Sequence, residues 1–332
     1  MKQGMKHVDI LFLNQASVES ILTPAAAFDA VKYAFRMHAQ KNVQMPAKIY
    51  LDFPRYAGDL RAMPASIGPL GASGVKIVNS HANNHRFGLP SVMAVFILVD
   101  PKTGRPVAIM DATRFTDMRT GAAGAVAADC LARKDAAVLG LVGAGRQAAA
   151  QLIAISRVRK ITLVKVCAKT DQEARDFARR MKRVTDIPVR QSSIEEACDA
   201  DIISTTTPSR KPIVMDRWIK PGTHINAIGA DAPGKQELEP ALLRRARVFL
   251  DDRGQAVHSG EVNVGIRTRR IAMNQIQGEI GEVLTRKIKG RISGRDITVF
   301  DSTGLAVQDV AVAFALYKKA LRLHKGRALR LF

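Results

Sequence analysis

The chain is poor in cysteine, in aromatic residues and in acidic residues relative to basic ones. Its three cysteines are widely spaced and form no Cys-x-x-Cys pair, which argues against a disulfide framework or a zinc ribbon. No apolar run is long enough to span a membrane, and the first ten residues lack the apolar stretch of a signal peptide. We therefore expect a cytoplasmic protein.

Basic residues are in large excess: 51 Lys and Arg stand against 30 Asp and Glu, for a net charge of +21. This charge indicates either a nucleic acid or anionic membrane partner, or a basic surface with a few cations for phosphates and carboxylates. No recognition motif and no basic stripe interleaved with aromatic residues occurs, which favours the second interpretation and no dedicated nucleic acid or membrane partner. Nucleic-acid binding would show as steeply salt-dependent retention on DNA. The densest basic run, Lys318–Arg330, is expected to be the solvated end of a C-terminal helix.

The stretch Val138–Ala148, VLGLVGAGRQA, is the most informative motif in the chain. Its apolar, β-branched run ends in a Gly-x-Gly-x-x-Ala turn, in which Gly143 suits the tight turn, Gly145 lets the backbone approach a phosphate and Ala148 lets the helix pack on its strand. A helix start without a ligand is the alternative. Because alternating strands and helices follow it, we predict a Rossmann domain that binds a dinucleotide.

The length of 332 residues and the 47% apolar content suit about two domains of an α/β protein. Strands with hairpin-like turns dominate the part before the glycine turn, which indicates a mixed α/β domain. We expect this first domain to comprise residues 1–118 and 306–332, with a doubly wound Rossmann domain at 119–305 inserted after its first part. A C-terminal helix then returns to the first domain.

Patterns of apolar residues and turn residues place the individual elements. The expected helices are Pro24–Gln40, Arg114–Arg133, Arg146–Arg157, Asp171–Val184, Ile194–Cys198, Glu237–Ala246, Glu279–Lys289 and Leu305–Leu323. The expected strands are Lys48–Phe53, Asp59–Pro64, Gly74–Asn79, Ser91–Asp100, Val107–Asp111, Val138–Gly143, Ile161–Ala168, Pro188–Gln191, Asp201–Thr206, Thr223–Gly229, Arg247–Asp251 and Asp296–Asp301.

The end of the second Rossmann strand bears on the choice between NAD and NADP. NAD sites usually carry an acidic residue there for the ribose 2′-hydroxyl, but this strand ends Cys167-Ala168-Lys169-Thr170. Lys169 can pair with a 2′-phosphate, and Thr170 can donate a hydrogen bond to it. The sequence therefore favours NADP, with NAD bound without the acidic contact as the alternative.

Seven motifs in order along the chain resemble the ornithine cyclodeaminase/mu-crystallin family, and within it most closely the archaeal-type alanine dehydrogenase branch. They cover about residues 45–313 and read RAMPA, VKIVN, GLPSVMA, DATRFTDMRTGAAGAVA, GLVGAGRQA, INAIGADAPGKQEL and DSTGLAVQDVA. The resemblance implies an enzyme that uses NAD(P), acts on a small amino acid or 2-oxo acid, and forms a homodimer through the first domain.

The resemblance also implies roles for individual residues. Lys76 matches the catalytic lysine, and Asp231 matches an aspartate at the junction of cofactor and substrate. A lysine beside another cation in a partly dry site has a lowered pKa, which suits proton transfer near neutral pH. Arg61 matches the arginine before Met-Pro-Ala, whose guanidinium can clamp a substrate carboxylate together with Lys76; the alternative is an ion pair with Asp59.

The cofactor-binding residues come from the glycine turn, the strand ends and the long helix before the turn. They are Arg119, Thr120, Gly143, Ala144, Gly145, Arg146, Gln147, Lys169, Thr170, Thr205, Thr206, Thr207, Ile228, Gly229, Ala230, Asp231, Ser302 and Thr303. By resemblance Arg119 and Thr120 contact the cofactor phosphates. Lys235 belongs to the same motif as Asp231, without a defined role. No metal is expected, because no carboxylate or cysteine joins the pair His81 and His85.

Two reactions share the implied scaffold, and both begin with hydride transfer from an amino-acid Cα. A dehydrogenase hydrates the imine and releases ammonia, whereas a cyclodeaminase closes a ring. Members that cyclise ornithine carry a Glu close before Met-Pro, and Arg61 stands in that region here. Since arginine repels a second ammonium, we expect reversible NAD(P)-dependent deamination of a small L-amino acid such as L-alanine. Ornithine cyclodeamination, reduction of a cyclic ketimine such as pyrroline-2-carboxylate, and NADPH-dependent binding without catalysis, as in mu-crystallin, are the alternatives.

Overall fold

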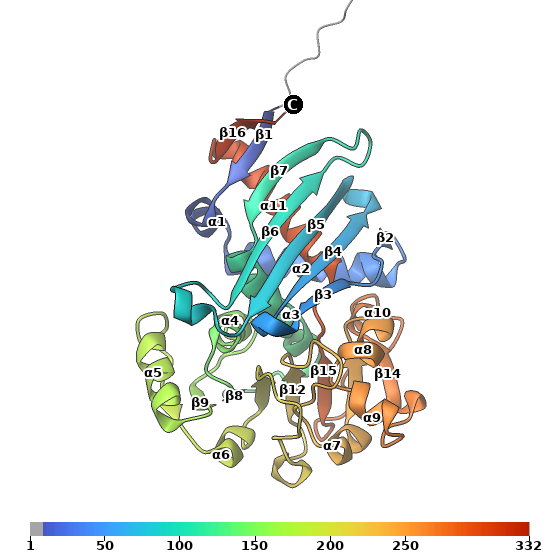
Figure 1. Cartoon of the computed structure of the whole chain (residues 1–332). Coiled ribbons are helices and arrows are strands. Elements are labelled where there is room, and N and C mark those ends of the chain that lie inside the picture. The colour runs from blue at the N-terminus through green and yellow to red at the C-terminus, as the bar shows by residue number, and fades with distance from the viewer. Residues whose placement is uncertain (1–8, 332) are drawn as a thin grey trace, which may run out of the picture. The chain divides into compact units, whose positions relative to one another are not determined.

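The computed structural model describes residues 9–331 (Figure 1). The first eight residues, which belong to the stretch used above to argue against a signal peptide, lie outside this range. Contacts divide the chain into unit 1, Met1–Arg119 with Leu305–Phe332, and unit 2, Thr120–Gly304. Both boundaries lie one residue from those expected from the sequence. Within the described range, no helix is both long enough and apolar enough to traverse a membrane.

Unit 1 is built on a mostly antiparallel sheet with the order β16-β1-β7-β6-β5-β4-β2, to which β3 adds by pairing with β4. Only the pair of β1 with β7 is parallel. The strands are β1 (Asp9–Leu13), β2 (Val43–Gln44), β3 (Ile49–Phe53), β4 (Gly58–Ile67), β5 (Ala72–His81), β6 (Val92–Val99), β7 (Pro106–Asp111) and β16 (Arg327–Arg330).

Strand β4 runs three residues beyond its expected end at Pro64. Proline cannot donate a hydrogen bond to a neighbouring strand, so it usually marks an edge or an end. Here β3 pairs with β4 only as far as Ala62, and β2 pairs with it only from Ser66. Pro64 pairs with Val75 of β5 on one side of β4, and on the other side it falls in the gap between β3 and β2, where no strand requires an N–H group from it.

Helices α2 and α11 pack against each other, and α11 also packs on β4, β5 and β6 (Figure 1). Thr23 caps α2 by accepting a hydrogen bond from the Ala26 N–H group, and Pro24 occupies the first turn, which are ordinary start signals for a helix. The helices of unit 1 are α1 (Gln15–Ile21), α2 (Pro24–Ala39) and α11 (Ala306–Arg322), together with the first part of α3 (Thr113–Leu131), in which the chain passes into unit 2.

The expectation that Lys318–Arg330 is the end of a helix is wrong beyond Arg322. Helix α11 stops there, and Gly326 takes a φ of +101°, a left-handed conformation that suits glycine. An added Cβ at Gly326 would lie 2.7 Å from Leu13 Cδ2. The chain turns at this glycine, and β16 pairs antiparallel with β1 at the edge of the sheet.

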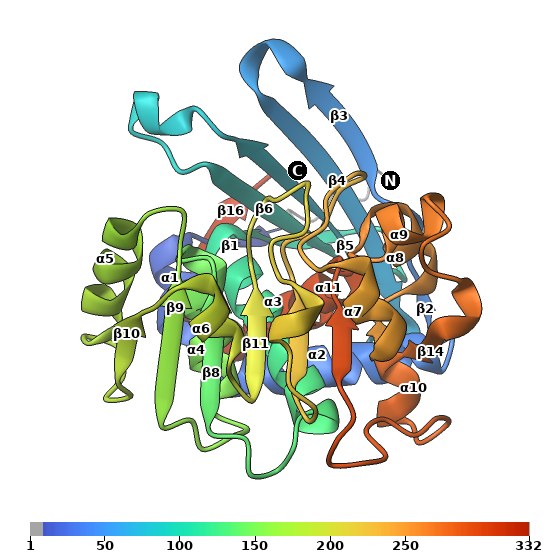
Figure 2. The same cartoon turned by 90° about the horizontal axis from the view of Figure 1, so that it is seen from below.

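Unit 2 is a parallel sheet with the order β10-β9-β8-β11-β12-β15-β13-β14; Figure 2 shows β9, β8 and β11 side by side. From β8 the chain winds outward through β9 and β10, then returns to place β11 on the other side of β8. This reversal is the point at which doubly wound sheets bind ligands. The strands are β8 (Val138–Val142), β9 (Leu163–Cys167), β10 (Val189–Gln191), β11 (Ile202–Thr205), β12 (His224–Ala227), β13 (Arg247–Leu250), β14 (Ile276–Glu279) and β15 (Thr298–Asp301).

The helices of unit 2 follow the expected order, with differences in the last third. They are α4 (Arg146–Ile155), α5 (Asp171–Met181), α6 (Ile194–Cys198), α7 (Pro240–Arg245), α8 (Arg253–Ser259), α9 (Asn263–Arg267) and α10 (Ile280–Leu284). The helix expected from Glu237 begins only at Pro240, which occupies its first turn. The helix expected over Glu279–Lys289 ends at Leu284. Strand β14 and helices α8 and α9 are additions that sequence patterns did not indicate.

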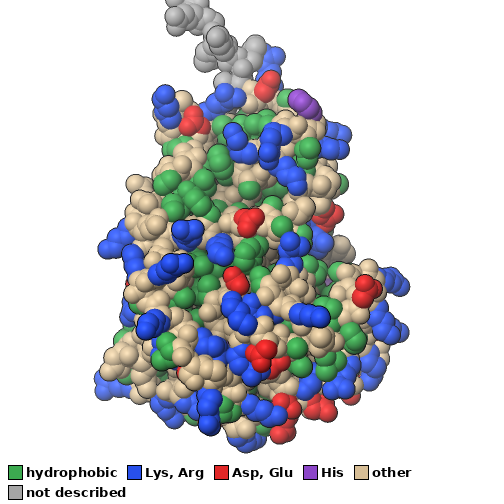
Figure 3. All heavy atoms as spheres, turned by 180° about the vertical axis from the view of Figure 1, so that it is seen from behind, with side chains coloured by type: hydrophobic (Ala, Val, Ile, Leu, Met, Phe, Trp, Pro, Cys, Tyr) green, Lys and Arg blue, Asp and Glu red, His purple; other side chains and the backbone are tan. Residues whose placement is uncertain are grey.

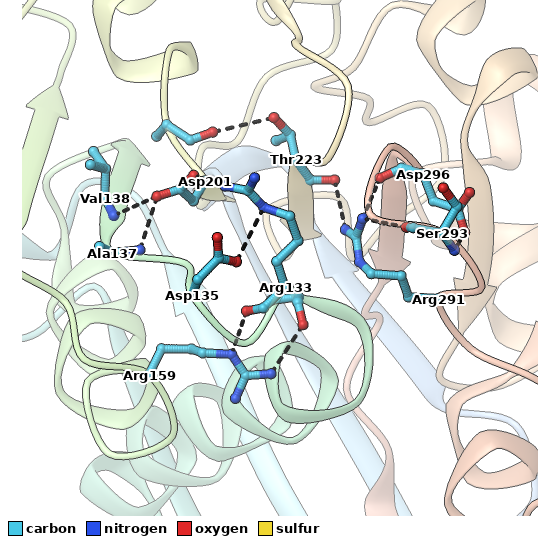
Figure 4. A network of polar contacts seen from close by, with 12 residues as sticks. Arg133, Asp135, Ala137, Val138, Arg159, Asp201, Thr223, Arg291, Ser293 and Asp296 are labelled. Carbon is cyan, nitrogen blue, oxygen red and sulfur yellow. Dashed lines mark hydrogen bonds and ion pairs between the residues drawn. The ribbon is translucent and has the colours of Figure 1, made fainter.

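The buried side chain of Arg159 satisfies carbonyl groups at the end of helix α3 (Figure 4). The Arg159 guanidinium donates to the carbonyl oxygens of Ala128 (2.8 Å), Asp129 (3.0 Å) and Ala132 (3.1 Å), and its Nε donates to Arg133 O at 2.8 Å. The last carbonyl groups of a helix have no partner within the helix, and a cation there also complements the helix dipole.

Two further arginines extend this network. Arg291 Nε donates to Leu131 O at 2.6 Å, again at the end of α3. Arg133 pairs with Asp201, whose other carboxylate oxygen accepts from the backbone N–H groups of Ala137 and Val138, both at 2.9 Å (Figure 4). Part of the large basic content of the chain therefore serves the structure of unit 2. On the face drawn in Figure 3, the other Lys and Arg side chains are scattered rather than gathered into one patch.

Candidate functional site

The glycine turn lies between β8 and α4 in unit 2. Gly143 has a φ of +111°, and an added Cβ there would lie 2.6 Å from Thr206 Oγ1, so the position needs glycine. Gly145 is the N-cap residue of α4, and no side chain caps this helix start. An added Cβ at Gly145 would meet nothing within 4 Å, whereas Ala148 is fully buried against the core.

This geometry fits a dinucleotide. A ten-residue helix whose start is capped by no side chain among the described residues, next to an exposed glycine, offers the usual cradle for a pyrophosphate. The adjacent residues Ala144, Arg146 and Gln147 belong to the same turn and the first turn of α4.

The end of β9 carries the residues expected to contact the adenosine ribose. Lys169 and Thr170 are exposed, and Thr170 caps α5 by accepting a hydrogen bond from the Glu173 N–H group at 3.2 Å. Arg180, which the sequence analysis did not single out, donates from α5 to the Ala144 carbonyl at 3.1 Å. A basic side chain of α5 therefore contacts the glycine turn.

A buried carboxylate ties together the loops after β11 and β12. Glu237 accepts hydrogen bonds from Thr205 Oγ1 (2.6 Å), from the N–H and hydroxyl groups of Thr207 (2.6 and 2.7 Å) and from Gly229 N (2.9 Å). The hydroxyl groups of Thr205 and Thr207 thus donate to protein, while Thr206 Oγ1 donates to Val142 O at 3.4 Å. Glu237 was not predicted as a site residue.

Further acidic residues lie buried behind Glu237. Both carboxylate oxygens of Glu261 accept from the Glu237 N–H group, at 2.9 and 3.0 Å. Burial raises the pKa of Glu237, and burial together with the charge of Glu237 raises the pKa of Glu261 well above its usual value. Burial also raises the pKa of Asp301, at the end of β15, to about 8. Glu237, Glu261 and Asp301 thus form a buried acidic group beneath the carboxyl ends of the strands.

The remaining predicted residues of unit 2 follow β12 and β15. Asp231 is half-buried and pairs with Lys235, whose Nζ lies 2.6 Å from Asp231 Oδ1. Ile228 and Ala230 are buried in the same loop. Thr303 donates to Asp251 Oδ1 at 3.0 Å, and Ser302 Oγ is buried with no hydrogen-bond partner among the described residues.

Lys76 lies in the middle of β5 in unit 1 and is only 1% exposed. Its Nζ forms an ion pair with Asp309 Oδ2 at 2.7 Å, and Arg119 Nε contacts the other oxygen, Asp309 Oδ1, at 3.1 Å. Arg119 also donates to Gln308 Oε1 at 3.2 Å. Burial lowers the pKa of Lys76 to about 7, with a further lowering by the charge of Arg119 against the opposing effect of Asp309.

Arg61 lies on β4, and its guanidinium forms a two-pronged contact with Asp59. Nε lies 2.9 Å from Oδ1 and Nη2 lies 3.1 Å from Oδ2, while the guanidinium stands 5.4 Å from the centre of the Tyr50 ring. The ion pair given above as the alternative for Arg61 is therefore present. A carboxylate and an aromatic ring hold the guanidinium in a fixed orientation.

The strand register places these residues on one face of the unit 1 sheet. Met63 pairs with Lys76, and Arg61 stands two residues before Met63, so Arg61 and Lys76 project to the same side. Tyr50 pairs with Arg61 and shares this face. The charge of Lys48, two residues before Tyr50, also lowers the pKa of Lys76. The face thus gathers several cations around few acids, an arrangement that suits an anionic ligand.

Sequence reasoning gave no role to Asp309 or Gln308. They are two polar residues in the first turns of a helix whose first half is otherwise apolar and buried, in the motif DSTGLAVQDVA. Two adjacent polar residues within this apolar stretch are the sequence feature that could have indicated a functional role. Arg119 and Thr120, expected at the cofactor phosphates, stand at the boundary of the units; Arg119 contacts Asp309, and the Thr120 carbonyl accepts from Gln151 Nε2 at 3.0 Å.

The fold and these sites define a protein that joins a Rossmann-type dinucleotide-binding unit to a second α/β unit. A model of the ornithine cyclodeaminase/mu-crystallin family matches residues 8–323. An alanine dehydrogenase from Archaeoglobus fulgidus is 47% identical over 325 residues, covering 98% of this chain and 99% of the relative. The chain belongs to the ornithine cyclodeaminase/mu-crystallin family.

Solved structures agree with this relationship. An archaeal alanine dehydrogenase dimer with bound NAD has a TM-score of 0.94 at 47% identity, over 98% of this chain and 100% of that one. A pyrroline-2-carboxylate reductase from Thermococcus litoralis, in complex with NADH and L-proline, has a TM-score of 0.93 at 33% identity, over 96% of this chain and 100% of that one. The predictions of the family, the fold class and a nicotinamide-dependent dehydrogenase are confirmed.

Proposed function

We propose that the protein catalyses the reversible, NAD(P)-dependent oxidative deamination of L-alanine or a similarly small L-amino acid, giving pyruvate or the matching 2-oxo acid and ammonia. The observation that carries the proposal is the 47% identity to an alanine dehydrogenase over 98% of the chain. The fixed guanidinium of Arg61 supports it, because the members that cyclise ornithine have a glutamate in this region. Because the Asp59 carboxylate already pairs with Arg61, it is not free to bind a side-chain ammonium, so the site suits a substrate with an uncharged side chain.

In this proposal, the bound nicotinamide supplies the hydride acceptor. Arg61, which shares one face of the sheet with Lys76, binds the substrate carboxylate and so orients the Cα–H bond of the substrate. The amine of Lys76 takes a proton from water as it adds to the imine carbon, and its ammonium returns the proton in the reverse direction. Asp231 exchanges protons with the substrate amine. The loops held by Glu237, with the glycine turn, bind the dinucleotide.

Deuterium transfer tests this reaction. With L-alanine deuterated at Cα, we expect reduced cofactor that carries one deuterium, together with equal amounts of pyruvate and ammonia, measured by mass spectrometry and chemical assay. L-ornithine offered in the same way should give no cyclic product. Proline formed from ornithine, without turnover of L-alanine, would contradict the proposal.

Reduction of a cyclic imine is the second candidate. The likeness to the Thermococcus litoralis reductase, at a TM-score of 0.93, favours it. Both reactions include a hydride transfer, and they differ in the proton transfer that accompanies it. Deamination requires activation of a water molecule for attack on the imine carbon. Reduction of a preformed cyclic imine requires protonation of the imine nitrogen instead. A titrating amine such as Lys76 serves both, so substrate comparison separates them.

For the cofactor, we propose NADP, with NAD as the alternative. Lys169 and Thr170 stand exposed at the end of β9 without an acidic residue, which supports NADP. The described relatives bind NAD or NADH, which supports NAD as the alternative. Measuring kcat/KM with NADPH and with NADH decides between them.

We also propose a homodimer. The archaeal alanine dehydrogenase is described as a dimer, and unit 1 carries exposed apolar side chains along β3, with Ile49 60% and Leu51 54% exposed. Light scattering of the purified chain measures its mass in solution.

Replacing Arg61 by Met should lower kcat/KM for L-alanine about 10- to 100-fold, mainly through a higher KM. The reason is the loss of a charge-assisted hydrogen bond to the carboxylate, worth about 1.5–3 kcal/mol. Steady-state kinetics at saturating cofactor measure the effect. Arg61→Lys keeps the charge without the planar fork and should fall between wild type and Arg61→Met. An unchanged KM in Arg61→Met would mean that Arg61 serves only its ion pair with Asp59.

The pH dependence should differ between the two directions of the reaction. The pKa of Lys76 is lowered to about 7, so the amine prevails above that pH and the ammonium below it. Deamination needs the amine, so kcat/KM for L-alanine should fall below about pH 7. Amination needs the ammonium, so kcat/KM for pyruvate, expressed per free ammonia, should fall above it. Losses on the same side of neutrality in both directions would exclude Lys76 as the proton carrier.

A further inference from the structure

Asp309 is a fully buried carboxylate in the first turns of α11. Each of its two oxygens contacts a different cation, Lys76 at 2.7 Å and Arg119 at 3.1 Å. These cations come from β5 and α3, so one side chain bridges three elements of unit 1. A buried aspartate beside a single lysine would form a simple ion pair, but here one carboxylate is shared by two cations.

The charges in this cluster do not cancel. Lys76 and Arg119 together carry two positive charges when protonated, and the neighbouring Lys48 adds a third, whereas Asp309 supplies one negative charge. Because Lys76 and Arg119 are 1% and 7% exposed, water screens their repulsion little. Among the described residues that act on Lys76, Asp309 alone favours its charged form, whereas burial, Arg119 and Lys48 oppose it.

Both the position and the charge of the Lys76 amine depend on the carboxylate of Asp309. The Lys76 side chain has four rotatable bonds, and its fixed ammonium position requires a partner of opposite charge. Gln308, one residue earlier, accepts a hydrogen bond from Arg119 and thereby holds the second cation against Asp309. The first turns of α11 are thus built to present Asp309 between the two cations.

We propose that Asp309 is the positioning residue of Lys76: its buried carboxylate fixes the Lys76 amine in place and offsets the positive charge that Lys76 shares with Arg119. The inference rests on the proposed function only insofar as that function uses the proton of Lys76. Asp309 itself acts through Lys76 and transfers no proton to the substrate.

Titration of Lys76 tests the proposal without any substrate. In protein labelled with 13C at lysine Cε, the Lys76 signal is identified by its loss in Lys76→Met and followed against pH. Asp309→Asn keeps the shape of the side chain but removes its charge, so the titration midpoint should move lower by about one to three pH units. Asp309→Glu keeps the charge and should stay near the wild-type midpoint. Lys318→Met, at an exposed position of the same helix, is the control and should leave the Lys76 midpoint unchanged.

Catalysis provides the second measurement. The pH limb of kcat/KM for pyruvate should move lower in Asp309→Asn by the same amount as the midpoint, and Asp309→Glu should restore it. A wild-type midpoint in folded Asp309→Asn, or the same lowered midpoint in Asp309→Glu, overturns the proposal. If Asp309→Asn does not fold, the Asp309→Glu midpoint still decides, because a lowered value there contradicts the role of the charge. A shifted midpoint in a protein that turns over no amino acid would support Asp309 and refute the proposed function.

Discussion

Lys76→Met is expected to lower kcat for L-alanine by about two to four orders of magnitude. The substitution removes the buried amine that pairs with Asp309, and the neighbouring Arg119 and Arg61 carry guanidinium groups, which do not serve as proton carriers. Methionine has a similar length and no charge, so it fills the space in β5, and Asp309 retains Arg119 as its partner. Stopped-flow measurement of the reduced cofactor distinguishes the chemical step from product release.

The variant should still bind the dinucleotide. Lys76 belongs to unit 1, whereas the glycine turn and its helix belong to unit 2. Fluorescence titration with NADH and NADPH should therefore give wild-type affinity. Lys165→Met serves as the matched control, because Lys165 is also a lysine in the middle of a strand and binds Asp199 O instead. Loss of cofactor binding in Lys76→Met, or loss of turnover in Lys165→Met, would show that the effect is not specific to the amine of Lys76.

Arg159→Ala should lower the free energy of unfolding by about 3–5 kcal/mol, the largest stability effect that we expect. Its guanidinium donates to carbonyl oxygens of Ala128, Asp129 and Ala132 at the end of α3. Alanine leaves these buried acceptors without a donor, and each unsatisfied group costs about 1–3 kcal/mol. Urea denaturation, followed by circular dichroism, measures the difference.

The controls for Arg159 separate charge from geometry. Arg157→Ala removes an exposed arginine two residues earlier and should change the free energy of unfolding by less than about 0.5 kcal/mol. Arg159→Lys keeps the charge but reaches fewer carbonyl groups, so it should lie between the two. Equal stability of Arg159→Ala and Arg157→Ala would mean that water replaces the guanidinium at the end of α3.

Local patterns predicted much of this molecule from its sequence. The glycine turn, the alternation of strands and helices after it, and a lysine among apolar strand neighbours each depend on residues close together in the chain. The predicted strand ended at Pro64 because a proline normally ends strand pairing. In the structure β4 continues past Pro64, because β3 pairs with β4 before this residue and β2 pairs with it after. Likewise, the basic composition of 327–330 gave no sign that these residues pair with β1.

Contacts between distant residues were not predictable in the same way. Lys76 and Asp309 are brought together by the packing of α11 on the sheet, and nothing near Lys76 in the sequence indicates its partner. The burial of Arg159 was not predictable either, because its sequence neighbourhood resembles that of the many surface arginines, yet its side chain is only 5% exposed. Glu237 lies in the same motif as Asp231, but no neighbouring residue in the sequence indicates that its carboxylate is buried. In the structure this carboxylate joins the loops after β11 and β12.

A comparison of substrates tests the central claim most directly. kcat/KM is measured for pyruvate with ammonia and for pyrroline-2-carboxylate, each with NADH and with NADPH, by the loss of cofactor absorbance. The account predicts that pyruvate with ammonia is the better substrate, and that omission of ammonia abolishes its turnover. Rapid reduction of the cyclic imine, with no turnover of pyruvate and ammonia, would contradict the account and make the protein an imine reductase.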